Sequence, residues 1–378
     1  MVATTVLLGT TKGTFLLVQE AGRWRARGPF CDGWPINHVI GDPQTGTIWA
    51  GGGNDWTGAG VWRSGDGGES WTLAQLSNGK FDEFLTNDPS FIEFVGHGPN
   101  PPAPFTGSVE SVWSLHHAGK RLLAGVKPAQ LYASDDGGAG WTRLDGLNDH
   151  PSAPEWQPGA AGLVLHSIVS DPGNPAHLWL GISAAGVFAS EDGGATWERR
   201  NRLSNAAAHH GHDHPAAPQG HEIGHCVHNL GRGSGGRLYQ QNHHGVFRSP
   251  DGGRNWDDIT EGLPSTFGFP VAVHPTDPET LWVIPLNGDM AGRFPPDAAA
   301  AVWRSRDGGA SWQACRNGLP QEGCFFTVLR QGMAVAPDAG LFFGTNSGSV
   351  FHSADEGETW HEIARHLPTV LAVEVMQA

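Results

Sequence analysis

The sequence predicts an all-β protein, a seven-bladed β-propeller built from four-stranded antiparallel blades. Six copies of the motif S-x-D-x-G-x-x-W recur along the chain, and recurrence of a unit this long indicates a repeat architecture. Short apolar segments precede each copy, as expected for a meander of strands. Residues 1–30 lack the motif but keep the strand pattern, and the apolar segment Val370–Glu374 supplies the strand that this first unit lacks.

The repeated motif has the chemistry of a hairpin turn between the third and fourth strands of a blade. Its aspartate can cap the turn, and the following glycines tolerate positive φ. The serine ends one strand, and the tryptophan begins the next and buries a large ring beneath the turn. The six copies begin at Ser64, Ser134, Ser190, Ser249, Ser305 and Ser353.

Taken in chain order, the strand patterns divide the sequence into seven units. The first has its second, third and fourth strands at the start of the chain and its innermost strand at the end, an arrangement that closes the ring and removes exposed edges. We therefore expect a single domain over residues 1–378. The predicted blades are 4–30 with 368–378, 36–78, 109–146, 163–203, 222–263, 268–318 and 326–366.

Four segments are too long to be simple turns. Three connect blades (78–107, 146–162 and 203–224), and the fourth (287–300) lies between the second and third strands of the sixth blade. In a propeller both kinds of loop lie on one face. Long loops in a compact domain are frequently lids or binding loops, so this loop-rich face is predicted to be the functional side.

Composition restricts the classes of function. The net charge of −15 argues against a nucleic-acid partner held by a basic face. No apolar stretch is long enough to cross a bilayer and no leader pattern precedes the first strand, so a cytoplasmic protein without a membrane partner is expected. Cys31, Cys226, Cys315 and Cys324 form no C-x-x-C pair, and their spacing demands no disulfide. The oligomeric state stays open.

The repeated motif identifies a resemblance to the Asp-box, or BNR-repeat, β-propellers over nearly the whole chain. Sialidases, sortilin-like receptors, xyloglucanases and photosystem assembly factors share this motif, so the resemblance implies the fold and leaves the activity open. A closer resemblance is to bacterial proteins described as exo-α-sialidase-like or WD40/YVTN/BNR-like repeat proteins. The segments that carry it are Lys127-Pro-Ala-Gln-Leu131, Trp156-Gln-Pro-Gly159, Leu165-His-Ser-Ile168, Cys226-Val-His228 and Gln241-Asn-His-His-Gly245.

The residues do not fit the sialidase activity that this resemblance suggests. Sialidases hold the sialate carboxylate with three arginines, the first in an F/Y-R-I-P motif, and they use a tyrosine–glutamate nucleophile pair. No such motif occurs near the start of this chain. Its two tyrosines, Tyr132 and Tyr239, occupy strand positions that are aromatic in other blades, so core packing explains them.

Two histidine-rich segments are weak evidence for a metal site. His221-Glu-Ile-Gly-His225 matches the zincin pattern H-E-x-x-H, which requires a helix to place both histidines beside the metal. Glycines at 220 and 224 and the strand that starts at Cys226 leave no room for that helix. The tract at 207–214 reads A-A-H-H-G-H-D-H; a solvated polar loop is the simpler interpretation, with metal binding as the alternative.

Strand positions give a sharper hypothesis for the site. Alignment of the blades on their second strands puts His166 and His225 at equivalent starts of innermost strands, together with Asn37. Polar side chains converging on a concave mouth are typical of a small-molecule site; hydrogen bonding to channel water is the alternative. We predict a site at the axial mouth built from Glu110, Lys127, His166, His225, His228, Asn242 and His243, with Trp156, Lys12 and His38 as further substrate contacts.

Within this site each residue has an expected role. His166, His225 and His228 are the predicted ligands of a divalent metal, zinc or manganese. On a regular strand the side chains of His225 and His228 point to opposite faces. Both can therefore reach the channel only if a bulge lies between them. Lys127 would neutralise negative charge, Glu110 is a further catalytic candidate, and His243 is the main alternative base.

These residues leave several functions open. The favoured one is a metal-assisted hydrolase or lyase acting on a small molecule or carbohydrate, because some polysaccharide lyases resemble this chain in carrying axial histidine metal sites on a propeller. A metal-independent glycosidase would need two carboxylates at a fixed separation, with Glu110, Asp55, Asp289 and Glu322 as candidates. A non-catalytic ligand- or protein-binding propeller, including an assembly factor, is the remaining class.

Overall fold

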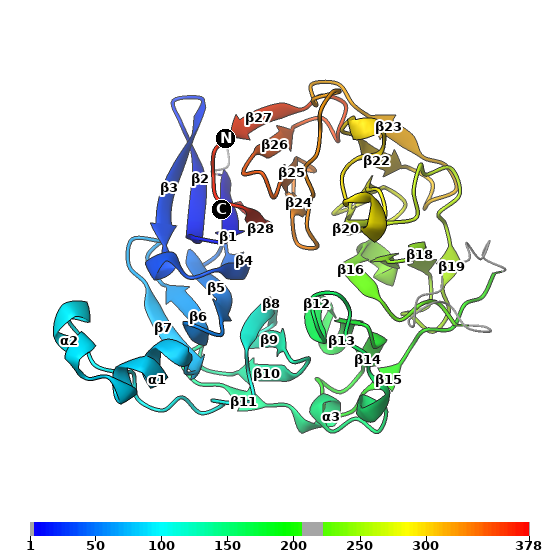
Figure 1. Cartoon of the computed structure of the whole chain (residues 1–378). Helices are drawn as coiled ribbons and strands as arrows, with labels where there is room; N and C mark the ends of the chain where they lie inside the picture. Colours follow the sequence, from blue (N-terminus) through cyan, green and yellow to red (C-terminus); the bar gives the residue numbers. More distant parts are fainter. Residues whose placement is uncertain (1–3, 206–221, 378) are drawn as a thin grey trace.

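The computed structural model describes residues 4–205 and 222–377, which form a ring of seven four-stranded antiparallel sheets (Figure 1). The predicted fold class is therefore confirmed. From the innermost strand outwards the blades are β28 (Val370–Gln377), β1 (Thr4–Thr10), β2 (Gly13–Glu20) and β3 (Arg23–Phe30); β4 (Ile36–Asp42), β5 (Thr47–Asn54), β6 (Gly58–Ser64) and β7 (Thr72–Ser77); β8 (Ser111–Ala118), β9 (Arg121–Lys127), β10 (Leu131–Ser134) and β11 (Thr142–Arg143); β12 (Val164–Asp171), β13 (Asn174–Ser183), β14 (Gly186–Ser190) and β15 (Glu198–Arg199); β16 (Val227–Arg232), β17 (Leu238–Asn242), β18 (Gly245–Ser249) and β19 (Asp257–Asp258); β20 (Gly268–Val273), β21 (Leu281–Pro285), β22 (Val302–Ser305) and β23 (Gln313–Cys315); and β24 (Met333–Val335), β25 (Leu341–Gly344), β26 (Val350–Ser353) and β27 (His361–Ala364).

The two ends of the chain close the ring inside one blade. Strand β28 pairs antiparallel with β1, with Val6 opposite Val375 and Leu8 opposite Val373, and Figure 1 shows the red and blue strands side by side. This is the predicted closure. It gives the first blade its inner strand and buries the apolar side chains of both strands against neighbouring blades.

The repeated motif forms the turn that its sequence predicts, as the fifth blade illustrates. Ser249 Oγ accepts the backbone N–H of Gly253 at 2.8 Å and donates to Asp251 Oδ1 at 2.9 Å. Asp251 Oδ1 also accepts the N–H of Asn255 at 2.9 Å. The Trp256 ring is fully buried, and its Nε1 donates to the carbonyl of Arg200 in the preceding blade at 2.9 Å. Each turn therefore fixes a tryptophan that packs between blades.

The insertions add short helices outside the sheets. The first forms α1 (Lys80–Asn87) and α2 (Ser90–Val95), which project from the ring (Figure 1). The second holds α3 (Asp145–Asn148) and the 3-10 turn η2 (Ala153–Glu155), and the fourth holds η4 (Asp289–Ala291) and η5 (Pro296–Ala298). Two more turns are η1 (Cys31–Gly33), which connects the first and second blades, and η3 (Ser234–Gly236), which lies within the fifth blade. Most of the third insertion, with the tract at 207–214, lies outside the described residues. No helix among those described is long and apolar enough to span a membrane.

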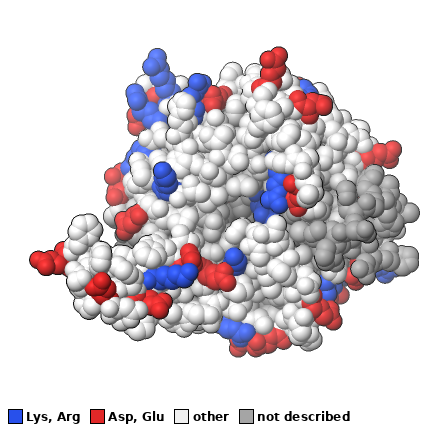
Figure 2. Space-filling view, in the orientation of Figure 1, with Lys and Arg blue, Asp and Glu red and all other residues white. Residues whose placement is uncertain are grey.

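Residues 329–331, just before β24, cross the axial channel and divide it. We call them the crossing segment. Asn229 Nδ2 donates to the carbonyl of Arg330 at 2.5 Å, and Gln331 Nε2 donates to the carbonyl of His166. On the other side of the channel, the N–H of Val373 donates to the carbonyl of Gln331 at 2.7 Å. Gln331 lines two cavities, one of about 90 Å³ and one of about 360 Å³. Figure 2 shows the hollow at the centre of the ring, with basic atoms at its rim.

Candidate metal centre

The innermost strands share one irregularity that positions side chains at the axis. Where most of them begin, the pairing with the neighbouring strand skips a residue, which is the signature of a β-bulge. A bulge re-aims the side chain of its extra residue. The skipped residues are Leu371, Asn37, Trp113, His166, His228 and the pair Phe269 and Pro270. Leu371, Asn37, Trp113 and His166 line the 90 Å³ cavity, together with Leu329, Arg330 and Gln331 from the crossing segment.

This register corrects the predicted alignment of the histidines. The residue of the fifth blade that occupies the place of His166 and Asn37 is His228, and His225 precedes the strand. The chain between paired residues of the first two strands differs in length from blade to blade. Counting back from the second strand therefore misses the equivalent position, and the predicted His225 lies three residues before His228. The bulge falls at His228 itself.

His228 is held with one ring nitrogen available to a ligand. Its Nδ1 lies 2.6 Å from the carbonyl of Gly268, and a carbonyl only accepts, so Nδ1 carries the proton. Burial, and then the positive charge of Arg330, hold the pKa of His228 well below its usual value. The imidazole is therefore neutral at pH 7, with the lone pair on Nε2. That lone pair faces Cys226 Sγ at 3.7 Å.

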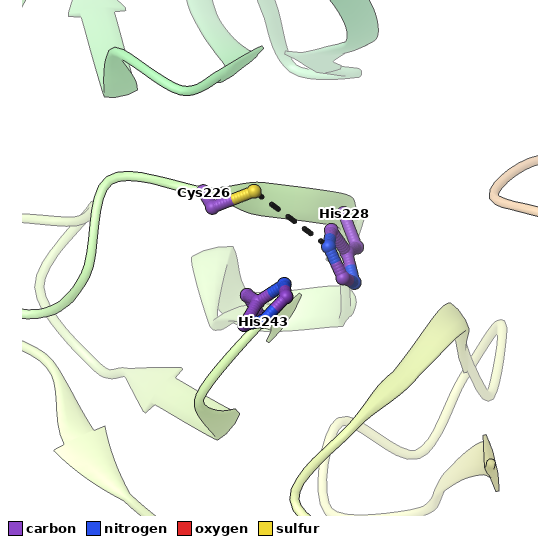
Figure 3. Close-up of side chains that lie close together, drawn as sticks. All are labelled: Cys226, His228 and His243. Carbon is purple, nitrogen blue, oxygen red and sulfur yellow. Dashed lines mark hydrogen bonds between the residues drawn. The ribbon is translucent and has the colours of Figure 1, made fainter. Parts of the chain in front are cut away.

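Cys226, His228 and His243 together form a group of potential metal ligands (Figure 3). One ligand atom from each lies within 4.8 Å of the other two. Cys226 directly precedes β16, and His228 is the bulged residue of that strand, while His243 comes from the turn between β17 and β18. The N–H of His243 donates to the carbonyl of Cys226 at 3.0 Å, which fixes the turn against the strand. Ligand atoms in tetrahedral zinc sites lie about 3.3 to 3.8 Å apart, so a small closure suffices.

Aromatic rings surround this group. Phe267 lies against both His228 and His243, with ring centroids 5.2 and 5.1 Å away, and the Phe269 ring lies 4.8 Å from that of His228. Burial raises the pKa of the Cys226 thiol, while a hydrogen bond from Ser183 and the charge of Arg330 oppose that rise. A bound divalent cation would remove the thiol proton despite the burial. An apolar shell of this kind limits water and strengthens electrostatic interactions at a metal.

The other two predicted ligands lie outside this group. His166 uses both ring nitrogens within the protein, since Nε2 lies 2.8 Å from the carbonyl of Val227 and Nδ1 lies 2.9 Å from Ser167 Oγ. His225 contacts Arg199 through Nδ1 at 2.6 Å and Glu222 through Nε2 at 3.0 Å. Burial, and then the charge of Arg199, lower the pKa of His225. The structure therefore brings together His228 and His243, with Cys226 as a third potential ligand that the prediction omitted.

The remaining predicted site residues divide between structural and solvent-exposed positions. Lys127 and Glu110 form an ion pair of 3.2 Å on the third blade. Asn242 is fully buried; its Nδ2 donates to the carbonyl of Gly224 at 2.5 Å, so it supports the turn that carries His243. Trp156 packs against Phe188 in the core, and Lys12 is exposed.

His38 lies on the other side of the crossing segment, in the 360 Å³ cavity. Its Nδ1 accepts the N–H of Leu115 at 2.9 Å, and its Nε2 faces Glu374 at 3.6 Å. In this structure His38 is thus part of a contact between the second, third and first blades, and it belongs neither to the Cys226 group nor to the lining of the 90 Å³ cavity.

Three expectations about weaker motifs agree with the structure. Glu222–His225 contains no helix, so the described part of the zincin-like sequence lacks the geometry that a zincin needs. Tyr132 and Tyr239 are buried, and their hydroxyls donate to Gln130 Oε1 at 2.6 Å and to the carbonyl of Pro278 at 2.7 Å. All four cysteines are free thiols.

Arg330 is the residue near this centre that the sequence did not reveal. It follows no motif and precedes the short strand β24. Its guanidinium lies over the Phe269 ring at 5.1 Å. Burial is the main cause that lowers the pKa of His166 and His228, and the charge of Arg330 is the next. Cys226 could have been included among the predicted ligands, because it lies two residues before His228 in the sequence.

Comparison with known proteins supports the fold. No family model and no curated protein matches the chain. Among solved structures, a GH74 xyloglucanase from Xanthomonas campestris shares 20% identity over 95% of this chain and 52% of its own, with a TM-score of 0.64. A GH74 enzyme from Niastella koreensis shares 15% over 98% and 51%, with a TM-score of 0.58. YCF48 bound to a D1 peptide shares 16% over 87% and 82%, with a TM-score of 0.52.

These similarities define the class of the protein as a β-propeller. The chain spans about half the length of each of the two GH74 enzymes. One fold of this kind carries both glycoside hydrolases and a peptide-binding protein, so the activity has to be argued from the site.

Proposed function

We infer that this propeller is a metal-assisted hydrolase or lyase that acts on a small molecule or carbohydrate. The observation that carries this inference is the convergence of Cys226, His228 and His243, whose ligand atoms lie within 4.8 Å of one another. Three protein ligands leave one position of a tetrahedral metal for the substrate, which is the usual composition of a catalytic zinc site. A metal held there would polarise a substrate oxygen or activate water.

The donor set favours zinc over manganese. A thiolate is a soft ligand that suits zinc, whereas manganese prefers carboxylate and water oxygens. The Gly268 carbonyl orients His228 and raises its basicity, as second-shell acceptors do in zinc sites. In this arrangement His243 is a ligand, and it replaces His225 and His166 in that role.

The metal-independent glycosidase has less support. A glycosidase needs two carboxyl groups facing one bond, yet three of the four candidate carboxylates are paired with cations, and the fourth, Glu322, is exposed. Asp55 lies 2.8 Å from Lys80, Glu110 lies 3.2 Å from Lys127, and Asp289 lies 2.5 Å from Arg293. Lys80 also lowers the pKa of Asp55, which is opposite to the shift that a catalytic acid requires.

Metal analysis of protein purified without a histidine tag tests the proposal. We expect one zinc per chain in the wild type, and loss of that zinc in Cys226→Ala and His228→Ala. Cys315→Ala is the matched control, because Cys315 is also a buried free thiol but lies in the outermost strand of the sixth blade. Wild-type protein that takes up no zinc, or Cys226→Ala that retains it, would refute the metal centre.

Activity then separates the classes. Because a structural neighbour is a xyloglucanase, xyloglucan is the first polymer to assay, followed by a panel of esters and acidic sugars. Turnover that a chelator abolishes and zinc restores supports the proposal. Turnover that is insensitive to chelation would identify a metal-independent glycosidase, and ligand binding without turnover would identify a binding propeller.

A further inference from the structure

The Arg330 guanidinium is buried and forms no ion pair in the described part of the chain, and the Asp289 carboxylate acts on its charge only from beyond ion-pair distance. No carboxylate of those residues lies within 4.0 Å of it, and its Nε is buried without a hydrogen-bond partner. Arg293, the other arginine over the Phe269 ring, is neutralised by Asp289 at 2.5 Å. A desolvated cation is costly unless an anion or hydrogen bonds compensate it.

The surroundings of Arg330 form a small, mostly apolar pocket. The cavity of about 90 Å³ is bounded by Trp113, Leu329 and Leu371, with Asn37, His166 and Gln331 at its polar side. Neither ring nitrogen of His166 is available, and Asn37 Nδ2 already donates to the carbonyl of Val112 at 2.8 Å. Among the described residues, Arg330 is therefore the only charged residue that lines this cavity. The volume corresponds to about three water molecules, which suits one small planar group.

We propose that Arg330 binds the carboxylate of the substrate, and that the substrate is a small organic acid or an acidic sugar. The guanidinium presents a planar fork that matches a carboxylate in bidentate fashion. One unpaired arginine supplies one positive charge, which a monoanionic carboxylate neutralises and a phosphate dianion exceeds. The stacked arrangement of Arg330, Phe269 and His228 places this anchor beside the metal ligands.

This inference rests on the proposed function, because it assigns the substrate class of the same site. With a thiolate and two neutral imidazoles as ligands, a bound Zn²⁺ keeps one net positive charge. The substrate carboxylate would then be held at Arg330, and an oxygen elsewhere on the substrate would face the metal. The carboxylate anchor and the metal are separate groups, so they can be removed separately.

The test uses acetate as the probe, acetamide as its neutral isostere and inorganic phosphate as the competing anion. Binding is followed as a saturable rise in Tm and by calorimetry, on wild-type protein and on Cys226→Ala. We expect acetate to stabilise both proteins and acetamide to stabilise neither, with phosphate at least tenfold weaker. Arg330→Gln should weaken acetate binding at least tenfold. Arg306→Gln, which alters an exposed arginine paired with Glu356, should leave it unchanged.

Each alternative outcome overturns one claim. Equal effects of acetamide, or tighter binding of phosphate, exclude a carboxylate site, and undiminished binding by Arg330→Gln excludes Arg330. Loss of binding in Cys226→Ala with retention in Arg330→Gln places the acetate on the metal. If Arg330→Gln does not fold, Arg330→Lys keeps the charge without the fork and should also weaken binding. Zinc without Arg330-dependent acetate binding refutes this inference alone, whereas Arg330-dependent binding without zinc refutes the metal centre alone.

Discussion

His166 Nε2 donates to the carbonyl of Val227, the residue immediately before His228, at 2.8 Å. The two histidines are the extra residues of equivalent bulges in neighbouring blades. One has both nitrogens engaged within the protein, and the other keeps Nε2 for Cys226 or for a metal. Equivalent positions of the repeat have therefore acquired different tasks. His166 cross-links two blades beside the potential ligand that His228 provides.

This difference predicts opposite effects of two alanine substitutions. His166→Ala removes the hydrogen bond to Val227, so we expect it to lower the free energy of unfolding by about 1 to 3 kcal/mol and to leave one zinc per chain. His228→Ala should lose the zinc. Denaturant unfolding together with metal analysis checks both. Loss of zinc from a folded His166→Ala protein would show that His166 is a ligand after all.

The repeated turns should matter for stability and not for the site, because they lie at the opposite ends of the strands. Asp251 caps its turn by accepting from Ser249, from the N–H of Asn255 and from its side chain. We expect Asp251→Ala to lower the free energy of unfolding by about 1 kcal/mol, as lost caps do. Zinc content should be unchanged, measured on the same preparation. A folded variant that has lost its zinc would contradict this assignment.

The same turns should contribute to acid sensitivity. Hydrogen bonds from Thr196 and Ser190 lower the pKa of Asp192 to about 2, while an unfolded aspartate titrates near 3.9. Because the folded pKa is depressed, the stabilisation is present above pH 4 and disappears as the pH falls from about 4 to about 2. Asp192→Asn should therefore have a lower Tm than the wild type at pH 7, and the difference should shrink towards pH 3. Glu322→Gln, on an exposed side chain, should show no such trend.

The fold followed from the sequence because its determinants are local. The turn requires an aspartate, glycines and a tryptophan at fixed spacing, so its motif can be recognised in the sequence. The closing strand could be predicted because the first unit lacks an innermost strand and the end of the chain carries one more. The site depends instead on bulges and on the contact of distant segments. One skipped residue decides that His228, and not His225, faces Cys226 and His243. Nothing local marks Arg330, which reaches the axis only because its segment crosses the channel.

That crossing segment yields the last prediction. Asn229 Nδ2 donates to the carbonyl of Arg330, and its Oδ1 accepts from the N–H of Leu230 at 2.8 Å. Asn229→Ala leaves a carbonyl without this donor beside the cavity, so we expect the free energy of unfolding to fall by about 1 to 3 kcal/mol.

A role for Asn229 in positioning Arg330 would also weaken the binding of acetate, whereas a purely structural role would leave it unchanged. Asn174→Ala is the control, because Asn174 makes its side-chain hydrogen bond in an exposed turn, to the N–H of Ala176. Denaturant unfolding and acetate titration of both variants separate the two effects. If Asn229→Ala is as stable as the wild type and binds acetate equally well, the crossing segment is held by Gln331 and the strand contacts alone, and Arg330 does not need Asn229 for its position.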